Sequence, residues 1–164
     1  MIYGNKEGIR DSLLAKLETL YDIEIPAEVF APAELLDVLA VFTCAINREI
    51  SIYVSRSGEV LDITIGGVSS VELKDMHLRR NTKRLSMVRC IHTHPGGNPQ
   101  LSDVDISSLR AMRFDAMAAV GAKDGHATGI GGMSGRICWR YESGAFDRGC
   151  SGLQTSAARL DGCH

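Results

Sequence analysis

Residues 91–105, IHTHPGGNPQLSDVD, constrain the fold more than any other part of the chain. Residues i and i+2 of a strand point to the same face, so His92 and His94 project together from a strand that a proline ends. The two glycines that follow let the chain turn back sharply. The sequence SDVD predicts a helix that begins at Ser102, with a capping serine and an acid three residues later. We therefore expect a strand, a tight turn and a helix whose first turn brings Asp105 back beside the histidines.

These side chains carry the ligand types of a metal site. Two imidazole nitrogens and one carboxylate oxygen are the composition of a catalytic zinc site, in which water takes the fourth position. We therefore expect His92, His94 and Asp105 to bind one zinc ion per chain. Taken singly, the H-x-H pair can be an ordinary strand, Ser102 a helix cap and Asp105 a capping-box acid, and only their joint spacing favours a metal. Cys90 lies on the same strand face and is either a small buried residue or a thiolate ligand that would make the site structural.

A zinc hydrolase also needs a carboxylate that takes a proton from the bound water and passes it to the leaving group. Three upstream glutamates are candidates: Glu49, Glu59 and Glu72. Glu59 falls in an expected hairpin turn and Glu72 in a segment without clear periodicity, so we expect both to face solvent. Glu49 lies where a helix gives way to a strand, and it is either the acid/base or a surface acid at a helix end.

Hydrophobic periodicity predicts the remaining elements. Apolar residues at helical spacing indicate two amphipathic helices, at 7–21 and 32–48. The segment ISIYVSRSGEVLDITIGG predicts a β-hairpin with a glycine-bearing turn. Further strands are expected at 85–94, 114–122 and 136–141, with KDGHATGIGGMSG as the connection between the last two. This order predicts the α/β (α+β) class, with a mixed β-sheet flanked by helices or a three-layer sandwich.

The domain is expected to span residues 1–141. Residues 142–164 are small, polar and without period, and we expect an irregular tail that is disordered or a truncation artefact. Residues 67–86, between the hairpin and the next strand, are expected to be mostly loop.

Bulk composition excludes several classes of protein. With 45% hydrophobic and 23% charged residues, the chain has the balance of a soluble globular domain. A net charge of −2 argues against a generally basic surface for nucleic acid. No apolar run approaches the ~20 residues of a membrane span, and the N-terminus lacks the apolar core of a secretory signal, so we expect a cytoplasmic protein with no membrane partner. Five scattered cysteines without a C-x-x-C pair match neither a disulfide framework nor a zinc finger.

The metal-site residues resemble the signature of JAMM (JAB1/MPN/Mov34) metalloproteases, which is an upstream Glu, then H-x-H-P, six residues and S-x-x-D. This chain has Glu49, then HTHP beginning at His92, GGNPQL, and SDVD beginning at Ser102. The resemblance implies that His92, His94 and Asp105 bind zinc. It implies that Glu49 activates the water and that Ser102 helps to stabilise the oxyanion. It also implies a JAMM/cytidine-deaminase-like three-layer sandwich that hydrolyses a peptide or isopeptide bond of a protein substrate.

A longer resemblance covers about residues 2–130, including IYGNKEGIRDSLLAKLETLYDIEIPAEVFAPAELL and NREISIYVSRSGEVLDITIGG. These segments are similar to the N-terminal extension of HflX-type GTP-binding proteins, a family that couples such a region to a GTPase domain and is associated with ribosomes. The turn HPGGNPQLSDVD also resembles RadC-type proteins, but the flanking segments favour the HflX-type resemblance. No G-x-x-x-x-G-K-[ST] motif occurs in the chain, so we expect no GTPase activity from it.

Two functions therefore stay open, and so does the oligomeric state. One is a zinc-dependent metallo(iso)peptidase. The alternative is a non-catalytic module that docks to the ribosome or regulates a partner GTPase domain. The segment HLRRNTKR supports the alternative, because its cationic side chains could contact rRNA phosphates: Arg79, Arg80, Lys83 and Arg84. The same segment can equally be a solvated loop.

Overall fold

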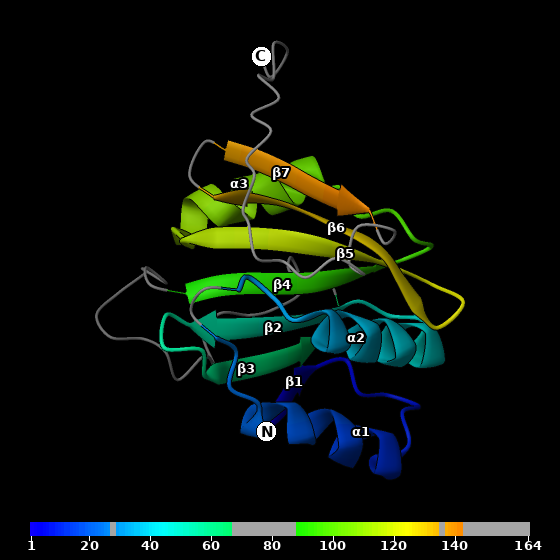
Figure 1. Cartoon of the computed structure of the whole chain (residues 1–164). Helices are drawn as coiled ribbons and strands as arrows, with labels where there is room; N and C mark the ends of the chain where they lie inside the picture. The colour runs from blue at the N-terminus through cyan, green and yellow to red at the C-terminus, as the bar shows by residue number, and fades with distance from the viewer. Residues whose placement is uncertain (27–28, 67–87, 135–136, 143–164) are drawn as a thin grey trace.

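The structure, a computed structural model, describes residues 1–26, 29–66 and 88–134 together with the backbone of 137–142. In this part of the chain, seven strands form one mixed sheet in the order β1-β3-β2-β4-β5-β6-β7 (Figure 1). The strands are β1 Ile2–Gly4, β2 Ile50–Ser55, β3 Val60–Ile65, β4 Val88–Pro95, β5 Ala116–Lys123, β6 His126–Ser134 and β7 Ile137–Glu142. The helices are α1 Asp11–Glu18, the 3-10 helix Thr19–Asp22, α2 Ala33–Ile46 and α3 Asp103–Met112.

Strand β4 lies in the middle of the sheet and has neighbours of both orientations. It pairs antiparallel with β2 and parallel with β5, so the C-terminal ends of β4 and β5 meet at the same edge. A parallel pair needs a crossover connection, and the turn after β4 together with α3 provides it. The prediction of a mixed sheet flanked by helices is confirmed.

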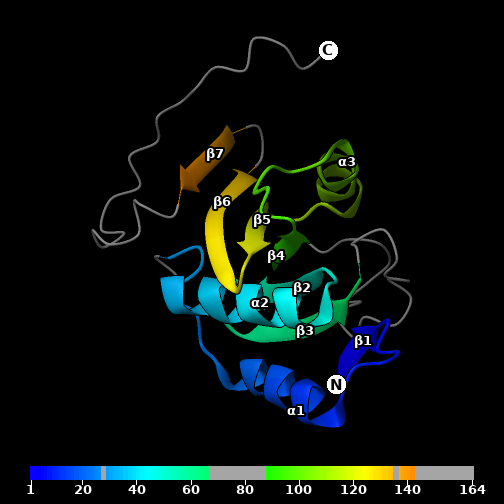
Figure 2. The ribbon, with the colours of Figure 1, turned by 90° about the vertical axis from the view of Figure 1, so that its right-hand side faces the viewer.

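The two faces of the sheet bury different groups of side chains. Along β4, Ile91 packs into a core with Leu36 and Leu39 of α2, whereas Cys90 packs into a second core with Leu109 of α3. Because alternate strand residues point to opposite faces, α2 and α3 cover opposite sides of β4. Figures 1 and 2 show α1 and α2 on one side of the sheet and α3 on the other. His92 and His94 share the parity of Cys90 and therefore lie on the α3 side.

Most predicted elements are present, with shifted ends. The first helix is shorter than the predicted 7–21, because the chain turns at Lys6–Ile9 before α1 begins at Asp11 and tightens into a 3-10 helix at Thr19. The second helix lies within the predicted 32–48 and ends at Ile46, because the next residue, Asn47, has a left-handed backbone with φ 50°. The predicted hairpin is formed by β2 and β3 around Gly58, at φ 99°.

The sequence does not predict two of the strands, β6 and β1, and the longer of them is β6. Its sequence, HATGIGGMS, was interpreted as a connection because glycine is depleted in strands. In the fold, β6 lies between β5 and β7 and pairs with both, so its backbone hydrogen bonds, together with the burial of Ile130 and Met133, stabilise it despite its glycines. The three-residue β1, which pairs parallel with β3, was also not predicted, because it is too short to show a period.

Several predictions fall on residues outside the described part of the chain. They are the loop at 67–86, with Glu72 and the cationic residues Arg79, Arg80, Lys83 and Arg84, and almost all of the predicted tail. The last strand reaches Glu142, one residue past the predicted domain end. None of the helices among the described residues has the length and apolar character needed to span a membrane.

Candidate metal centre

Strand β4 carries the two histidines toward α3, near the C-terminal end of the strand. The His92 side chain is wholly buried, and the His94 side chain is 16% exposed. Their Nε2 atoms lie 3.0 Å apart, and their rings meet edge to face with centroids 4.7 Å apart. The i, i+2 spacing therefore places both imidazoles on one face, as predicted, with their Nε2 atoms directed to the same point.

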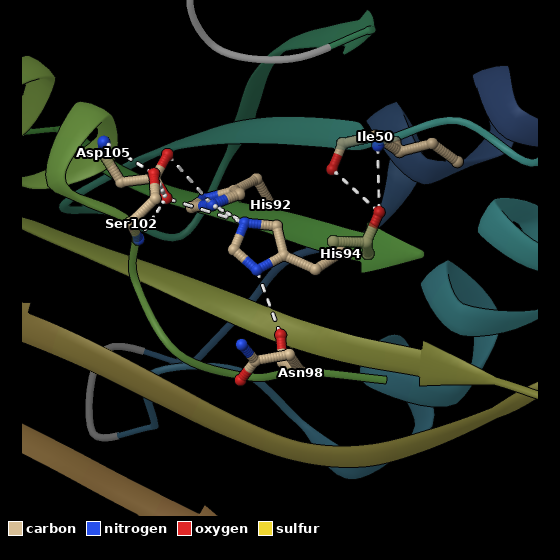
Figure 3. Close-up of polar contacts among 7 residues, drawn as sticks. Ile50, His92, His94, Asn98, Ser102 and Asp105 are labelled. Atoms are coloured by element: carbon tan, nitrogen blue, oxygen red, sulfur yellow. Dashed lines mark hydrogen bonds and ion pairs between the residues drawn. The ribbon is translucent and has the colours of Figure 1, made fainter. Parts of the chain in front are cut away.

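The first turn of α3 supplies the carboxylate. Ser102 caps the helix, and its hydroxyl accepts the backbone N–H of Asp105 at 3.2 Å. In return, Oδ2 of Asp105 accepts the backbone N–H of Ser102 at 2.8 Å and its hydroxyl at 2.7 Å. This capping box holds the carboxylate toward the histidines, as Figure 3 shows, with Oδ1 3.4 Å from Nε2 of His92 and Oδ2 3.6 Å from Nε2 of His94.

The three side chains have the separations that a metal site requires. Their possible ligand atoms all lie within 4.8 Å of one another, and among the described residues this is the group that could hold a metal ion. Ligand atoms ~2.0–2.1 Å from a tetrahedral zinc ion lie ~3.3–3.4 Å from each other. The two Nε2 atoms are 3.0 Å apart, and the Asp105 carboxylate approaches them through a different oxygen each, at 3.4 Å through Oδ1 and 3.6 Å through Oδ2, which is close to that value. The donor set of two imidazoles and one carboxylate also fits a site with three protein ligands.

The turn after β4 selects the tautomer of His94. Its Nδ1 lies 3.0 Å from the backbone oxygen of Asn98, which can only accept a hydrogen bond. The proton must therefore sit on Nδ1, which leaves the Nε2 lone pair free for a metal. The turn itself uses Gly96 and Gly97 at φ 93° and 86°. Thr128 of β6 anchors it by donating its hydroxyl to the Gly97 carbonyl at 2.7 Å.

The Asp105 carboxylate and the His94 imidazole stabilise each other's charged forms. Burial favours the neutral form of Asp105, but hydrogen bonds with His92, His94 and Ser102 outweigh it and hold the pKa of Asp105 well below its usual range. Burial also disfavours the charged form of His94. Its hydrogen bonds to Asp105 and Asn98, with the nearby charges of Asp105 and Glu49, nevertheless raise the pKa of His94. The site therefore holds an ionised carboxylate, as a metal ligand must be.

Glu49 lies on the same face of the sheet, just before β2. In the β2–β4 pairing Ser51 is opposite His92, and continuing this register by two residues places Glu49 opposite His94. The Glu49 backbone is fixed by its carbonyl, which accepts the N–H of Gly66 at 2.8 Å. Its side chain is partly exposed, and its charge acts on His94. The structure thus brings Glu49 beside the ligand group without making it a member.

Strand β4 is also tied down on the other face. The hydroxyl of Thr93, the residue between the two histidines, accepts the backbone N–H of Ile50 at 2.9 Å and is hydrogen-bonded to Thr43 of α2. Because alternate strand residues point to opposite faces, Thr93 makes these contacts on the face opposite to the ligand side chains. The register that places Glu49 and Ser51 across from the histidines is therefore held by a buried side chain.

Other candidates from the sequence are separated from the site. Glu59 lies exposed in the turn between β2 and β3, as predicted. Cys90 is wholly buried beside Tyr53 and Leu109, and burial raises the pKa of its thiol, so the thiol stays protonated. Within the described residues it does not belong to the ligand group.

Sequence reasoning did not single out three residues beside the site, namely Ser51, which is paired with His92, and Asn98 and Thr128. Asn98 acts through its backbone carbonyl, and Thr128 donates its hydroxyl to the backbone carbonyl of Gly97, so no side-chain pattern gives a signal for either contact. Ser51 follows Glu49 by two residues, so strand period could have placed it on the same face. Comparisons with protein families, with curated proteins and with solved structures found nothing that matches this chain.

Proposed function

We propose that this domain binds one zinc ion through His92, His94 and Asp105 and hydrolyses a peptide or isopeptide bond. The observation that carries the proposal is the convergence of the two imidazole Nε2 atoms and the Asp105 carboxylate at separations of 3.0, 3.4 and 3.6 Å, with Glu49 on the same sheet face. Two nitrogens and one carboxylate oxygen suit zinc better than magnesium or calcium, which prefer oxygen ligands alone.

The side chains around the ligands have separate tasks in this proposal. Zinc with three protein ligands lowers the pKa of the water that it holds to about 7. Glu49 takes a proton from the attacking water and delivers it to the leaving amine. Ser102 keeps Asp105 in place by accepting its backbone N–H, and the hydroxyl proton that it donates to Oδ2 would turn from Oδ2 to the developing oxyanion during the reaction.

The family assignment is part of the same proposal. A mixed sheet with helices on both faces, and the ligands at the end of its central strand, supports a JAMM/cytidine-deaminase-like three-layer sandwich. The resemblance of residues 2–130 to HflX-type proteins adds the proposal that the domain acts beside a GTPase domain.

Metal content tests the binding part. Protein prepared without a histidine tag should contain about one zinc per chain by elemental analysis after incubation with zinc and gel filtration. Asp105→Ala should lose that zinc because it removes a ligand. Asp103→Ala is the matched control, since Asp103 is an exposed acid in the same helical turn and outside the ligand group. Wild-type protein that stays free of zinc would overturn the proposal.

Activity tests the hydrolase part. Glu49→Gln should bind zinc like the wild type but cleave a degenerate peptide library or an isopeptide-linked protein pair ~10²–10⁴-fold more slowly, since it cannot take a proton. Zinc-loaded wild-type protein that cleaves neither kind of substrate would contradict the hydrolase and leave a metal-binding module.

A further inference from the structure

The adjacent strands β3, β2 and β4 carry a row of buried polar side chains beside the candidate metal centre. Thr64 is paired with Ser51, and Ser51 is paired with His92, so the three side chains share the sheet face that carries the ligands. All three are wholly buried. Polar side chains in such a position are expected to have hydrogen-bond partners.

Within the described part of the chain, three atoms of this row lack such partners: Nδ1 of His92 and the hydroxyl oxygens of Ser51 and Thr64. In contrast to Nδ1 of His92, Nδ1 of His94 has a partner, the carbonyl oxygen of Asn98. A histidine that binds metal through Nε2 must carry its proton on Nδ1, and that proton normally has an acceptor. His92 therefore needs an acceptor that its own turn does not provide.

The pairing of the strands identifies one candidate for that acceptor. On one side, the residue opposite His92 is Ala119 of β5, which has no polar side-chain atom. On the other side it is Ser51 of β2. Directly opposite residues of an antiparallel pair have Cβ atoms ~4.5–5.5 Å apart, and rotation about one bond then carries a serine hydroxyl within reach of the neighbouring ring.

We propose that Ser51 is a positioning residue for the metal centre: its hydroxyl oxygen accepts the Nδ1–H of His92 and so directs Nε2 toward the metal. The inference rests on the proposed function, since it takes His92 to be a ligand. It assigns one orienting partner to each histidine, a backbone carbonyl for His94 and a strand side chain for His92. Ser51 itself touches neither metal nor substrate.

Zinc affinity tests the proposal, measured by competition with a chelator of known affinity at one pH. Ser51→Ala should weaken zinc binding ~10–100-fold, the usual effect of removing an outer partner of a metal-binding histidine. Ser51→Thr keeps the hydroxyl and should restore most of the affinity. Thr64→Val is the matched control, because it removes a buried hydroxyl one strand farther from the ring and should bind zinc like the wild type.

Nuclear magnetic resonance of the ring nitrogens tests the proposal in the wild-type protein, so the test does not depend on whether a variant folds. In zinc-loaded wild-type protein, Nδ1 of His92 should be protonated and its proton should exchange slowly with water. A deprotonated or freely exchanging Nδ1 would overturn the proposal. In Ser51→Ala this signal should move while that of His94 stays, because a general loosening of the fold would shift both.

The outcomes separate this inference from the function on which it rests. Wild-type protein that binds no zinc would overturn both. Wild-type protein that binds zinc, with Ser51→Ala equally tight, would overturn the role of Ser51 alone. Equal losses in Ser51→Ala and Thr64→Val would also overturn it, since the cause would then be a weakened core.

Discussion

Each histidine of the metal centre has two ring nitrogens, and its neighbours decide which one is free to bind. For His94 the decision is made by the carbonyl of Asn98, four residues along the chain. For His92 we infer that it is made by Ser51, from a different strand. The carboxylate of Asp105 is oriented by Ser102 through the capping box. With the proposed contact of Ser51, each of the three candidate ligands has a second residue that orients it, so less conformational freedom would be lost when a metal binds.

The Asp105–His94 pair also makes the stability of the metal-free protein depend on pH. The pKa of Asp105 is lowered by folding, so its contribution is present above the unfolded value of about 4 and is lost as the pH falls through the folded value. The pKa of His94 is raised by folding, so its contribution is present below the unfolded value of about 6.5 and is lost as the pH rises through the folded value. The pair therefore stabilises most between about pH 4 and 6.5.

Replacement of the carboxylate should expose this dependence. Without metal, Asp105→Asn should lower the free energy of unfolding by about 2 kcal/mol at pH 5.5, because it removes a nearly buried charged hydrogen-bond partner. The loss should be smaller at pH 3 and at pH 8, as measured by urea denaturation. An equal loss at all three pH values would show that the pair does not titrate as described.

At the scale of elements, β4 pairs with β5, and the turn that follows β4 packs against β5 and β6. The carbonyl of Gly97 accepts the Thr128 hydroxyl and lies directly over Gly121 of β5, where a Cβ atom would overlap both groups. Gly121 is therefore needed because a side chain at this position would overlap the Gly97 carbonyl and the Thr128 hydroxyl. The next residue, Asn98, orients His94 through its carbonyl. The packing of the turn against β5 and β6 therefore affects the orientation of the His94 ring.

Gly121→Ala should displace the turn and so affect the site. We expect a loss of about 1–3 kcal/mol in unfolding free energy from overpacking, together with weaker zinc binding. Gly125→Ala is the control. It lies at φ 79° in the next turn, where an added Cβ meets nothing within 4 Å, so it should cost stability through backbone strain alone. Zinc titrations and denaturation of both variants would test this, and equal zinc affinities would argue against the link.

At the scale of the whole molecule, the site joins two stretches that are distant in the chain. The ligands come from β4 and α3, and Glu49 comes from the junction of α2 and β2. Such a site forms when the sheet forms, so zinc should bind the folded chain far more tightly than the unfolded one.

Zinc should therefore raise the thermal stability in proportion to its affinity. At 100 times the dissociation constant the gain is about 2.7 kcal/mol, which for a domain of this size raises Tm by about 5–10 °C. Calorimetry with and without zinc would measure it, and excess chelator should reverse it. Asp105→Ala should show no such shift, and an equal shift in that variant would place the zinc elsewhere.

The sequence by itself determined the parts of this site that depend on local geometry. His92 and His94 share a face because strand residues alternate, and Asp105 returns to them because a serine cap and an acid three residues later start a helix. Both relations act within a few residues and survive in any fold that contains them. The fold class could likewise be predicted from the sequence, because the spacing of apolar residues distinguishes helices from strands.

Only the tertiary structure decided which distant residues face the ligands. Glu49 and Ser51 stand across from the histidines because β2 pairs with β4 in one register, and a shift of one residue would turn both side chains to the other face. The glycine-rich β6 forms because its neighbours on both sides supply hydrogen bonds. Strand register is set by the packing of the whole sheet, including Thr93 against Thr43 and Ile50, and no short stretch of sequence contains that information.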